Sequence, residues 1–417
     1  MQKKTILFII LSGVASFFNY AMYPALARIL SNEEFVSITV ALAIFTQLSS
    51  FTLSIVAITI GLSKQKDAKD AKTTVEKLQA VLTHLFIALL LLFLLFSPML
   101  FSKISLSPTL LMPIVLMLIL SIIMSVVSGY LNGKGKLIKL GLSLVVTSLL
   151  QLICSVVIGV STKDGALTLY AMSAGTILSL AYIYTAYRTE DLPSLASVFV
   201  HRFNIYRTKE LRSLLMYVIF ASLSVLAINI LLILDLLLIN GRQTDSKIYA
   251  DIYIVSRIVY FGGMLFLWPF LSNINVLNLK KNVGLLLRVC SVFMAITLCS
   301  LLAMQLFGQQ ITHLLFGGQY QAWNDVRVLA ILAILYKFNF LVITTLVMFF
   351  IVIRSRWAII VSAFATLSLG LLAVLYNSTA TTANLVSGLV IVSFAVLLFG
   401  LYGFILTCNK TMLKTSN

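Results

Sequence analysis

Charged side chains stand inside several apolar stretches of this 417-residue chain. Asp235, Arg257 and Lys337 each lie well within a run of hydrophobic residues, and Arg28 ends the first such run. A charge at membrane depth costs roughly 2.5–3.5 kcal/mol on insertion scales, so it persists only where it faces protein or water. These four residues are therefore the candidates for binding or coupling chemistry.

The composition places these charges in an integral membrane protein. Hydrophobic residues make up 60% of the chain, charged residues 10%, and the mean hydropathy is +1.06. Apolar runs of about 20 residues, the length at which a helix crosses the hydrocarbon core, recur along the whole sequence. We predict an all-α integral membrane fold of about twelve transmembrane helices, at residues 5–30, 35–63, 80–101, 109–131, 141–160, 167–187, 214–240, 250–273, 287–307, 326–350, 357–376 and 384–407.

The basic residues predict the orientation of these spans. Most of the 30 lysines and arginines fall in loops that alternate spans place on one side of the membrane. Such an excess marks the cytoplasmic side, so we expect both termini in the cytoplasm. This distribution also accounts for the net charge of +17 without a nucleic-acid partner.

The longest connection divides the predicted spans into two sets of six. It covers residues 188–213, is basic, and carries Pro193. Many transporters are built from repeated helical units with the substrate site at their interface. We therefore expect two six-helix bundles around a central cavity: an N-terminal half (1–187), a cytoplasmic linker (188–213), a C-terminal half (214–408) and a cytoplasmic tail (409–417).

Motifs for enzyme chemistry do not stand out. The segment from Gly133 to Lys136 lacks the spacing and the Ser or Thr of a phosphate-binding loop. The three histidines share no predicted helix face, and the four cysteines lack metal-ligand spacing. We expect neither a metal nor a cofactor, and a carrier or structural membrane protein rather than an enzyme.

Two glycines four residues apart close the fourth predicted span. Gly129 and Gly133 have the spacing that lets a neighbouring helix backbone approach closely. The same residues also fit a turn before the basic loop at 134–139. Both interpretations stand at this point.

The intramembrane charges sum to three cations and one anion. If they share a cavity, its net positive charge favours an anionic group such as a pyrophosphate, which Arg grips through its fork and Lys as a point charge. Simpler interpretations also exist. Arg28 marks the outer interface, and the long Lys337 side chain extends its ammonium toward the membrane–water interface. Asp235 either pairs with Arg257 or Lys337, or titrates in an ion-coupling cycle.

Four groups of short segments follow one another along the chain, and their order carries more information than any one of them. They are Leu26–Leu30 with Glu33–Phe35, Asp235–Ile239 with Tyr253 and Arg257, Leu314–Tyr320 followed by Ala322 and Val328–Ala330, and Arg354–Trp357. In this order they resemble the polysaccharide-transporter branch of the MOP flippase superfamily, which includes Wzx-type O-antigen flippases.

The resemblance implies a flippase for a polyprenyl-pyrophosphate-linked oligosaccharide in the bacterial cytoplasmic (inner) membrane. Arg257 and Lys337 would then neutralise the pyrophosphate, Arg28 would assist near the outer mouth, and Asp235 would couple a cation gradient or pair structurally. Membrane lipids and other membrane proteins of polysaccharide assembly are the further partners implied.

Two alternatives remain open from the sequence. A multidrug or organic-ion exporter of the same superfamily would share the scaffold, but organic cations favour acidic cavity residues. A membrane glycan polymerase or ligase would need a large outer loop, and none of the predicted outer loops is long enough.

Overall fold

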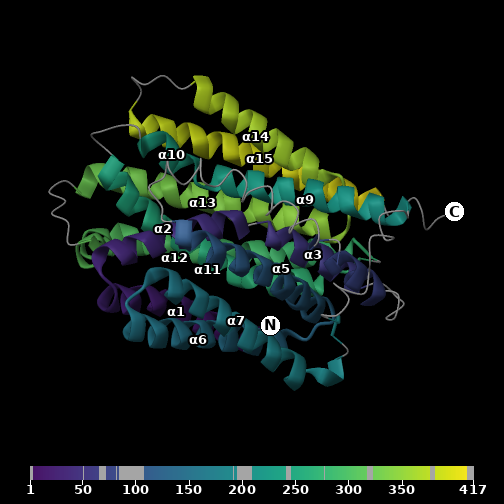
Figure 1. The fold of residues 1–417 in the computed structure, drawn as a ribbon. Coiled ribbons are helices and arrows are strands. Elements are labelled where there is room, and N and C mark those ends of the chain that lie inside the picture. Colours follow the sequence, from purple (N-terminus) through teal and green to yellow (C-terminus); the bar gives the residue numbers. More distant parts are fainter. Residues whose placement is uncertain are drawn as a thin grey trace. The chain divides into compact units, whose positions relative to one another are not determined.

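The computed structural model describes residues 3–49, 51–64, 72–80, 82–83, 108–190, 192–194, 209–240, 246–276, 278–316, 323–375 and 381–410. Every regular element in these segments is a helix, which confirms the all-α prediction (Figure 1). The chain forms two units, Met1–Ser222 and Leu223–Asn417. The predicted linker at 188–213 lies largely outside the described residues.

Nine helices in the described segments are long and apolar enough to cross a membrane. They coincide with the predicted first, fourth to sixth, and eighth to twelfth spans, as expected for a multi-pass membrane protein. The predicted third span, 80–101, lies almost entirely outside the described residues. The second and seventh spans are each divided into two shorter helices.

The first unit contains six long or medium helices and two short ones. They are α1 (Lys3–Ile29), α2 (Asn32–Ser49), α3 (Thr52–Ser63), η1 (Pro108–Leu110), α5 (Leu111–Gly133), α6 (Leu137–Thr162), α7 (Gly165–Ala186) and η2 (Arg188–Glu190). Residues 72–80 are also helical. Helix α6 packs against both α1 and α7, and α5 packs against α3 and α7 (Figure 1).

The predicted second span is not one continuous helix, because α2 and α3 are separated near Phe51. Hydroxyl side chains there donate to nearby backbone carbonyls: Ser49 Oγ to Thr46 O at 3.1 Å and Ser54 Oγ to Phe51 O at 2.6 Å. Such local bonds offer the backbone an alternative to helical pairing. These bonds lie on either side of a division that the hydrophobic pattern does not predict.

The glycine pair in α5 lies at a close helix contact. A Cβ atom at Gly129 would come within 2.7 Å of Thr59 Cβ and 2.8 Å of Val56 O, both on α3. One turn further on, a Cβ at Gly133 would come within 3.0 Å of Ile60 O. The close-approach interpretation is confirmed, since only a residue without a side chain lets these backbones pack so closely.

The segment after α7 is attached to the loop between α5 and α6. Glu190 accepts from Lys136 Nζ, with 3.0 Å between Nζ and Oε2, and also pairs with Lys139. The hydroxyl of Tyr187 donates to Lys139 O at 3.1 Å. The hydrogen bond from Lys139 and then that from Lys136 hold the pKa of Glu190 below its usual range.

The second unit is built around one buried helix. It contains the end of α9 (Lys209–Leu232), α10 (Leu234–Asn240), α11 (Ser246–Asn273), α12 (Lys281–Phe316), α13 (Trp323–Val352), α14 (Trp357–Leu375) and α15 (Thr382–Lys410). Helix α13 contacts α11, α12, α14 and α15 (Figure 1). Its residues 339–352 are all buried, so a charge beside this stretch must find its partner within the protein.

We predict that Gly129→Ala destabilises the protein by roughly 1–3 kcal/mol, because the added methyl overlaps α3 in a packed contact. The measurement is the unfolding of the purified protein in a lipid nanodisc. Gly13→Ala in α1 is the matched control, since nothing lies within 4 Å of a Cβ placed there. Equal stability of the two variants would contradict the close contact.

We predict that Glu190→Gln speeds hydrogen exchange in residues 188–190 at neutral pH, because the two lysines lose their anionic partner. Since the pKa of Glu190 is lowered in the folded protein, its contribution is present above the usual glutamate value of about 4.3 and is lost as pH falls through the folded pKa. Exchange at pH 7 is the measurement, with α5 as internal reference. Identical exchange in the variant and the native chain would be inconsistent with the attachment.

Candidate functional site

The seventh predicted span is interrupted in its middle. Helix α9 ends at Leu232, α10 begins at Leu234, and between them Ile233 N–H donates to Ile230 O at 3.2 Å, a tighter turn than an α-helix makes. A helix end leaves carbonyl groups without helical donors. In lipid each such group costs several kcal/mol unless another part of the protein supplies a donor.

Two adjacent side chains of α13 donate to the carbonyls at this break. The Tyr336 hydroxyl donates to Leu231 O at 2.6 Å, and Lys337 Nζ donates to Leu232 O at 2.7 Å. Both side chains are fully buried. Tyr336 and Lys337 of α13 therefore supply the hydrogen-bond donors that the carbonyls at the α9–α10 break need.

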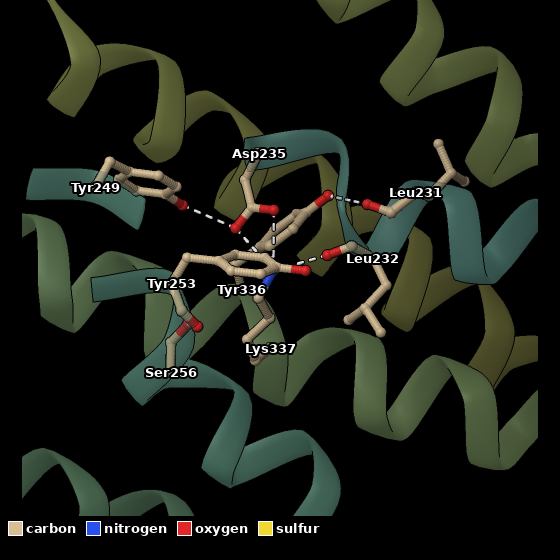
Figure 2. Close-up of polar contacts among 8 residues, drawn as sticks. All are labelled: Leu231, Leu232, Asp235, Tyr249, Tyr253, Ser256, Tyr336 and Lys337. Atoms are coloured by element: carbon tan, nitrogen blue, oxygen red, sulfur yellow. Dashed lines mark hydrogen bonds and ion pairs between the residues drawn. The ribbon is translucent and has the colours of Figure 1, made fainter. Parts of the chain in front are cut away.

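Asp235 lies in the first turn of α10 and pairs with Lys337. The Nζ atom is 2.9 Å from Oδ1 and 2.7 Å from Oδ2, and both side chains have an exposed fraction of 0%. The Tyr249 hydroxyl of α11 donates to the same Oδ2 at 2.8 Å (Figure 2). With Leu232 O, the ammonium has one oxygen for each of its three donors.

The ring of Tyr253, on α11, is shared by two cations. Lys337 Nζ lies 4.4 Å from the ring centre and the Arg257 guanidinium carbon 5.4 Å from it. The guanidinium also lies 4.8 Å from the centre of Phe261. The negative faces of these rings stabilise positive charge.

Arg257 is the surplus cation of this group of residues. We call the group the Asp235 cluster, and its members are Leu232, Asp235, Tyr249, Tyr253, Arg257, Tyr336 and Lys337. Asp235 neutralises Lys337. Arg257 is only half-buried, and no carboxylate in the described part of the chain pairs with it. Within the described residues, Arg257 is thus the predicted site residue of this unit with unused hydrogen-bonding and charge capacity.

The predicted site residues are brought together only in part. Asp235, Arg257 and Lys337 form one cluster within the second unit, and the pairing of Asp235 with Lys337 is one of the alternatives that the sequence left open. Arg28 belongs to the first unit, where it is exposed in the last turn of α1. A cation there interacts favourably with the helix dipole.

Sequence reasoning missed the partners that complete the cluster. The donor role of Tyr249, fourteen residues after Asp235, has no local signal, and neither do the carbonyls of Leu231 and Leu232. Tyr336 gave a weak signal, since a buried tyrosine beside a buried lysine needs a partner for its hydroxyl. Nothing in the apolar run around Ile233, which lacks proline and glycine, indicates the break.

No metal centre is evident in the described residues, where three or more His, Cys, Asp or Glu side chains do not gather at any one place. The charged groups of the Asp235 cluster are instead held by each other and by tyrosines.

Solved structures with the same arrangement of helices are transporters. A multidrug resistance MATE family transporter of the MOP superfamily, in an outward-facing conformation, is 15% identical, with a TM-score of 0.79 over 99% of this chain and 96% of that one. A MOP superfamily transporter from Pyrococcus furiosus is also 15% identical, with a TM-score of 0.77 over 97% of this chain and 94% of that one. The fold is that of MOP-superfamily transporters.

The family assignment rests on sequence. Residues 2–270 match the family described as "Polysaccharide biosynthesis protein". The chain therefore belongs to that family, which confirms the resemblance seen in its motifs. A search of curated proteins gives no match.

We predict that the Asp235–Lys337 pair is strongly coupled in its contribution to stability. Asp235→Asn and Lys337→Met should each destabilise the protein by roughly 3–5 kcal/mol, because each leaves an uncompensated buried charge. The double variant, which buries no charge, should be less destabilised than the sum of the two single variants. Unfolding of all four proteins in nanodiscs measures the coupling, and additive effects would contradict the pairing.

Proposed function

We propose that this chain is a flippase that translocates a polyprenyl-pyrophosphate-linked oligosaccharide, an O-antigen or other surface polysaccharide unit, from the inner to the outer leaflet by alternating access. The hydrophilic glycan and pyrophosphate pass through the protein while the polyprenyl tail stays in lipid. Membership in the polysaccharide biosynthesis family and the transporter fold support this proposal. The chain acts as a carrier, not as an enzyme.

The surplus charge of Arg257 is the observation that carries the proposal. A pyrophosphate needs a cation that is accessible and not already neutralised, and a guanidinium binds two phosphate oxygens at once. Arg257 is half-buried and held against Tyr253 and Phe261, which orients its planar head. Arg28, exposed at the end of α1, is the second cation that we propose for the lipid-linked substrate, near the outer mouth.

Lys337 takes an indirect part in this proposal. Its ammonium is neutralised by Asp235 and also bound by Leu232 O, so it does not bind the pyrophosphate directly and instead supports the residues around Arg257. It also positions Tyr253, whose ring lies against both cations. We therefore expect Arg257, not Lys337, to dominate substrate binding.

The exporter alternative is supported by the MATE structures, which at 15% identity establish a shared fold. An organic cation would need an accessible acidic group. Asp235 does not provide one, because it is fully buried and already paired with Lys337. The charge of the cluster therefore favours an anionic substrate.

We predict that Arg257→Ala abolishes translocation in cells while leaving the protein in the membrane, because the substrate pyrophosphate loses its cation. The measurement is mass spectrometry of lipid-linked intermediates in cells whose native gene is depleted and replaced by the variant. A complete polyprenyl-pyrophosphate oligosaccharide should accumulate, and its mass identifies the glycan.

Arg257→Lys and Arg288→Ala are the matched controls. The first keeps the charge without the fork and should restore part of the activity. The second removes an exposed arginine of α12 from outside the cluster and should behave as the native chain. Normal processing of the lipid-linked glycan by Arg257→Ala, or increased sensitivity to organic cations without lipid accumulation, would refute the proposal.

A further inference from the structure

The oxygens around Lys337 Nζ form a receptor for an ammonium ion. Asp235 Oδ1, Asp235 Oδ2 and Leu232 O lie 2.9, 2.7 and 2.7 Å from the nitrogen. The ring centres of Tyr253 and Tyr336 lie 4.4 and 4.9 Å from it. A carboxylate and a carbonyl supply charge and acceptors, and the aromatic faces supply cation–π attraction, so every feature of the site suits a primary ammonium.

Contacts that do not involve the Lys337 side chain hold this receptor in shape. Tyr249 donates to Asp235 Oδ2, and Tyr336 donates to Leu231 O, next to the ligating carbonyl (Figure 2). The oxygens come from α9 and α10, whereas the ammonium comes from α13. Tyr336 lies on the same helix as Lys337, but its hydrogen bond to Leu231 O does not use the lysine side chain. The receptor is therefore preorganised by contacts other than those of the Lys337 side chain, which occupies the receptor as a covalently attached ligand.

The receptor lies at a helix break, and Lys337 fills it there in place of a free cation. In transporters, interrupted helices in mid-membrane often bind free cations through unwound backbone carbonyls. In this chain the carbonyl and the carboxylate at such a break are filled by an amino group of the protein itself.

We propose that the Asp235 cluster is a primary-ammonium site whose resident cation is built into the chain as Lys337, and that a free alkylammonium of matching length can replace it when that side chain is removed. The native protein then needs no free cation at this position. That consequence for transport rests on the proposed flippase function, whereas the binding claim does not.

Chemical rescue of Lys337→Ala tests the proposal. Alanine keeps Cβ, and n-propylammonium supplies the missing Cγ, Cδ, Cε and Nζ atoms. The purified variant in nanodiscs, prepared with the probe present from solubilisation onward, should unfold at a temperature higher by at least roughly 2 °C with n-propylammonium than with 1-propanol or with NaCl at the same concentration. The native chain should show no such difference.

The double variant Asp235→Asn/Lys337→Ala is the matched control, because it keeps the space but loses the carboxylate. It should not respond to n-propylammonium. Equal stabilisation of Lys337→Ala by n-propylammonium and 1-propanol would show that only space is being filled. Equal stabilisation by Na⁺ would show a site for bare cations. Either result, or an equal response of the double variant, would overturn the proposal.

If Lys337→Ala does not fold without the probe, the proposal can still be tested. In that case the yield of monodisperse protein becomes the readout, and n-propylammonium during solubilisation should raise it several-fold over 1-propanol. If the yield stays low with the probe while Asp235→Asn/Lys337→Met folds normally, the unpaired carboxylate has not accepted an external ammonium, and the proposal is wrong. No substrate is present in these measurements, so their failure and that of the flippase proposal are distinguishable.

Discussion

The buried contact between α13 and the break in α9–α10 is the constraint on which the second unit depends. Lys337 is fully buried, and residues 339–352 of the same helix are buried as well, so the ammonium is shielded from water. Its charge is tolerable only because Asp235 and a freed carbonyl meet it. The break is tolerable only because Tyr336 and Lys337 supply donors. The buried charge and the helix break therefore offset each other's energetic cost.

This mutual dependence separates two roles that the sequence does not distinguish, structural support and substrate binding. Lys337 and Asp235 hold the unit together, and Tyr253 links them to Arg257. Arg257 keeps its charge available at the edge of the cluster. A transporter that handles a pyrophosphate needs both a rigid charged scaffold and an accessible cation, and adjacent turns of α11 provide the connection between them.

Hydrophobic patterning predicts most of this fold, and its failures have physical causes. Long apolar runs leave little choice but membrane helices, so nine spans coincide with helices of the structure. The glycine pair at 129 and 133 correctly indicates a close contact. The division near Phe51 leaves no signal in the hydrophobic pattern. The division at Ile233 escapes prediction because its carbonyls depend on donors from Tyr336 and Lys337, 105 positions away in the chain. For the same reason the three intramembrane charges of this unit and the possible pairing of Asp235 with Lys337 can be found from the sequence, but the hydroxyl of Tyr249 and the carbonyls of Leu231 and Leu232 cannot.

Translocation by the purified protein is the decisive test of the flippase proposal. The protein is reconstituted in liposomes that carry a polyprenyl-pyrophosphate oligosaccharide, and a membrane-impermeant glycan-modifying reagent reports the leaflet of each molecule over time. We expect transfer between leaflets with the native chain and its loss with Arg257→Ala. Leaflet exchange no faster than in protein-free liposomes, with folded protein present, would overturn the flippase proposal.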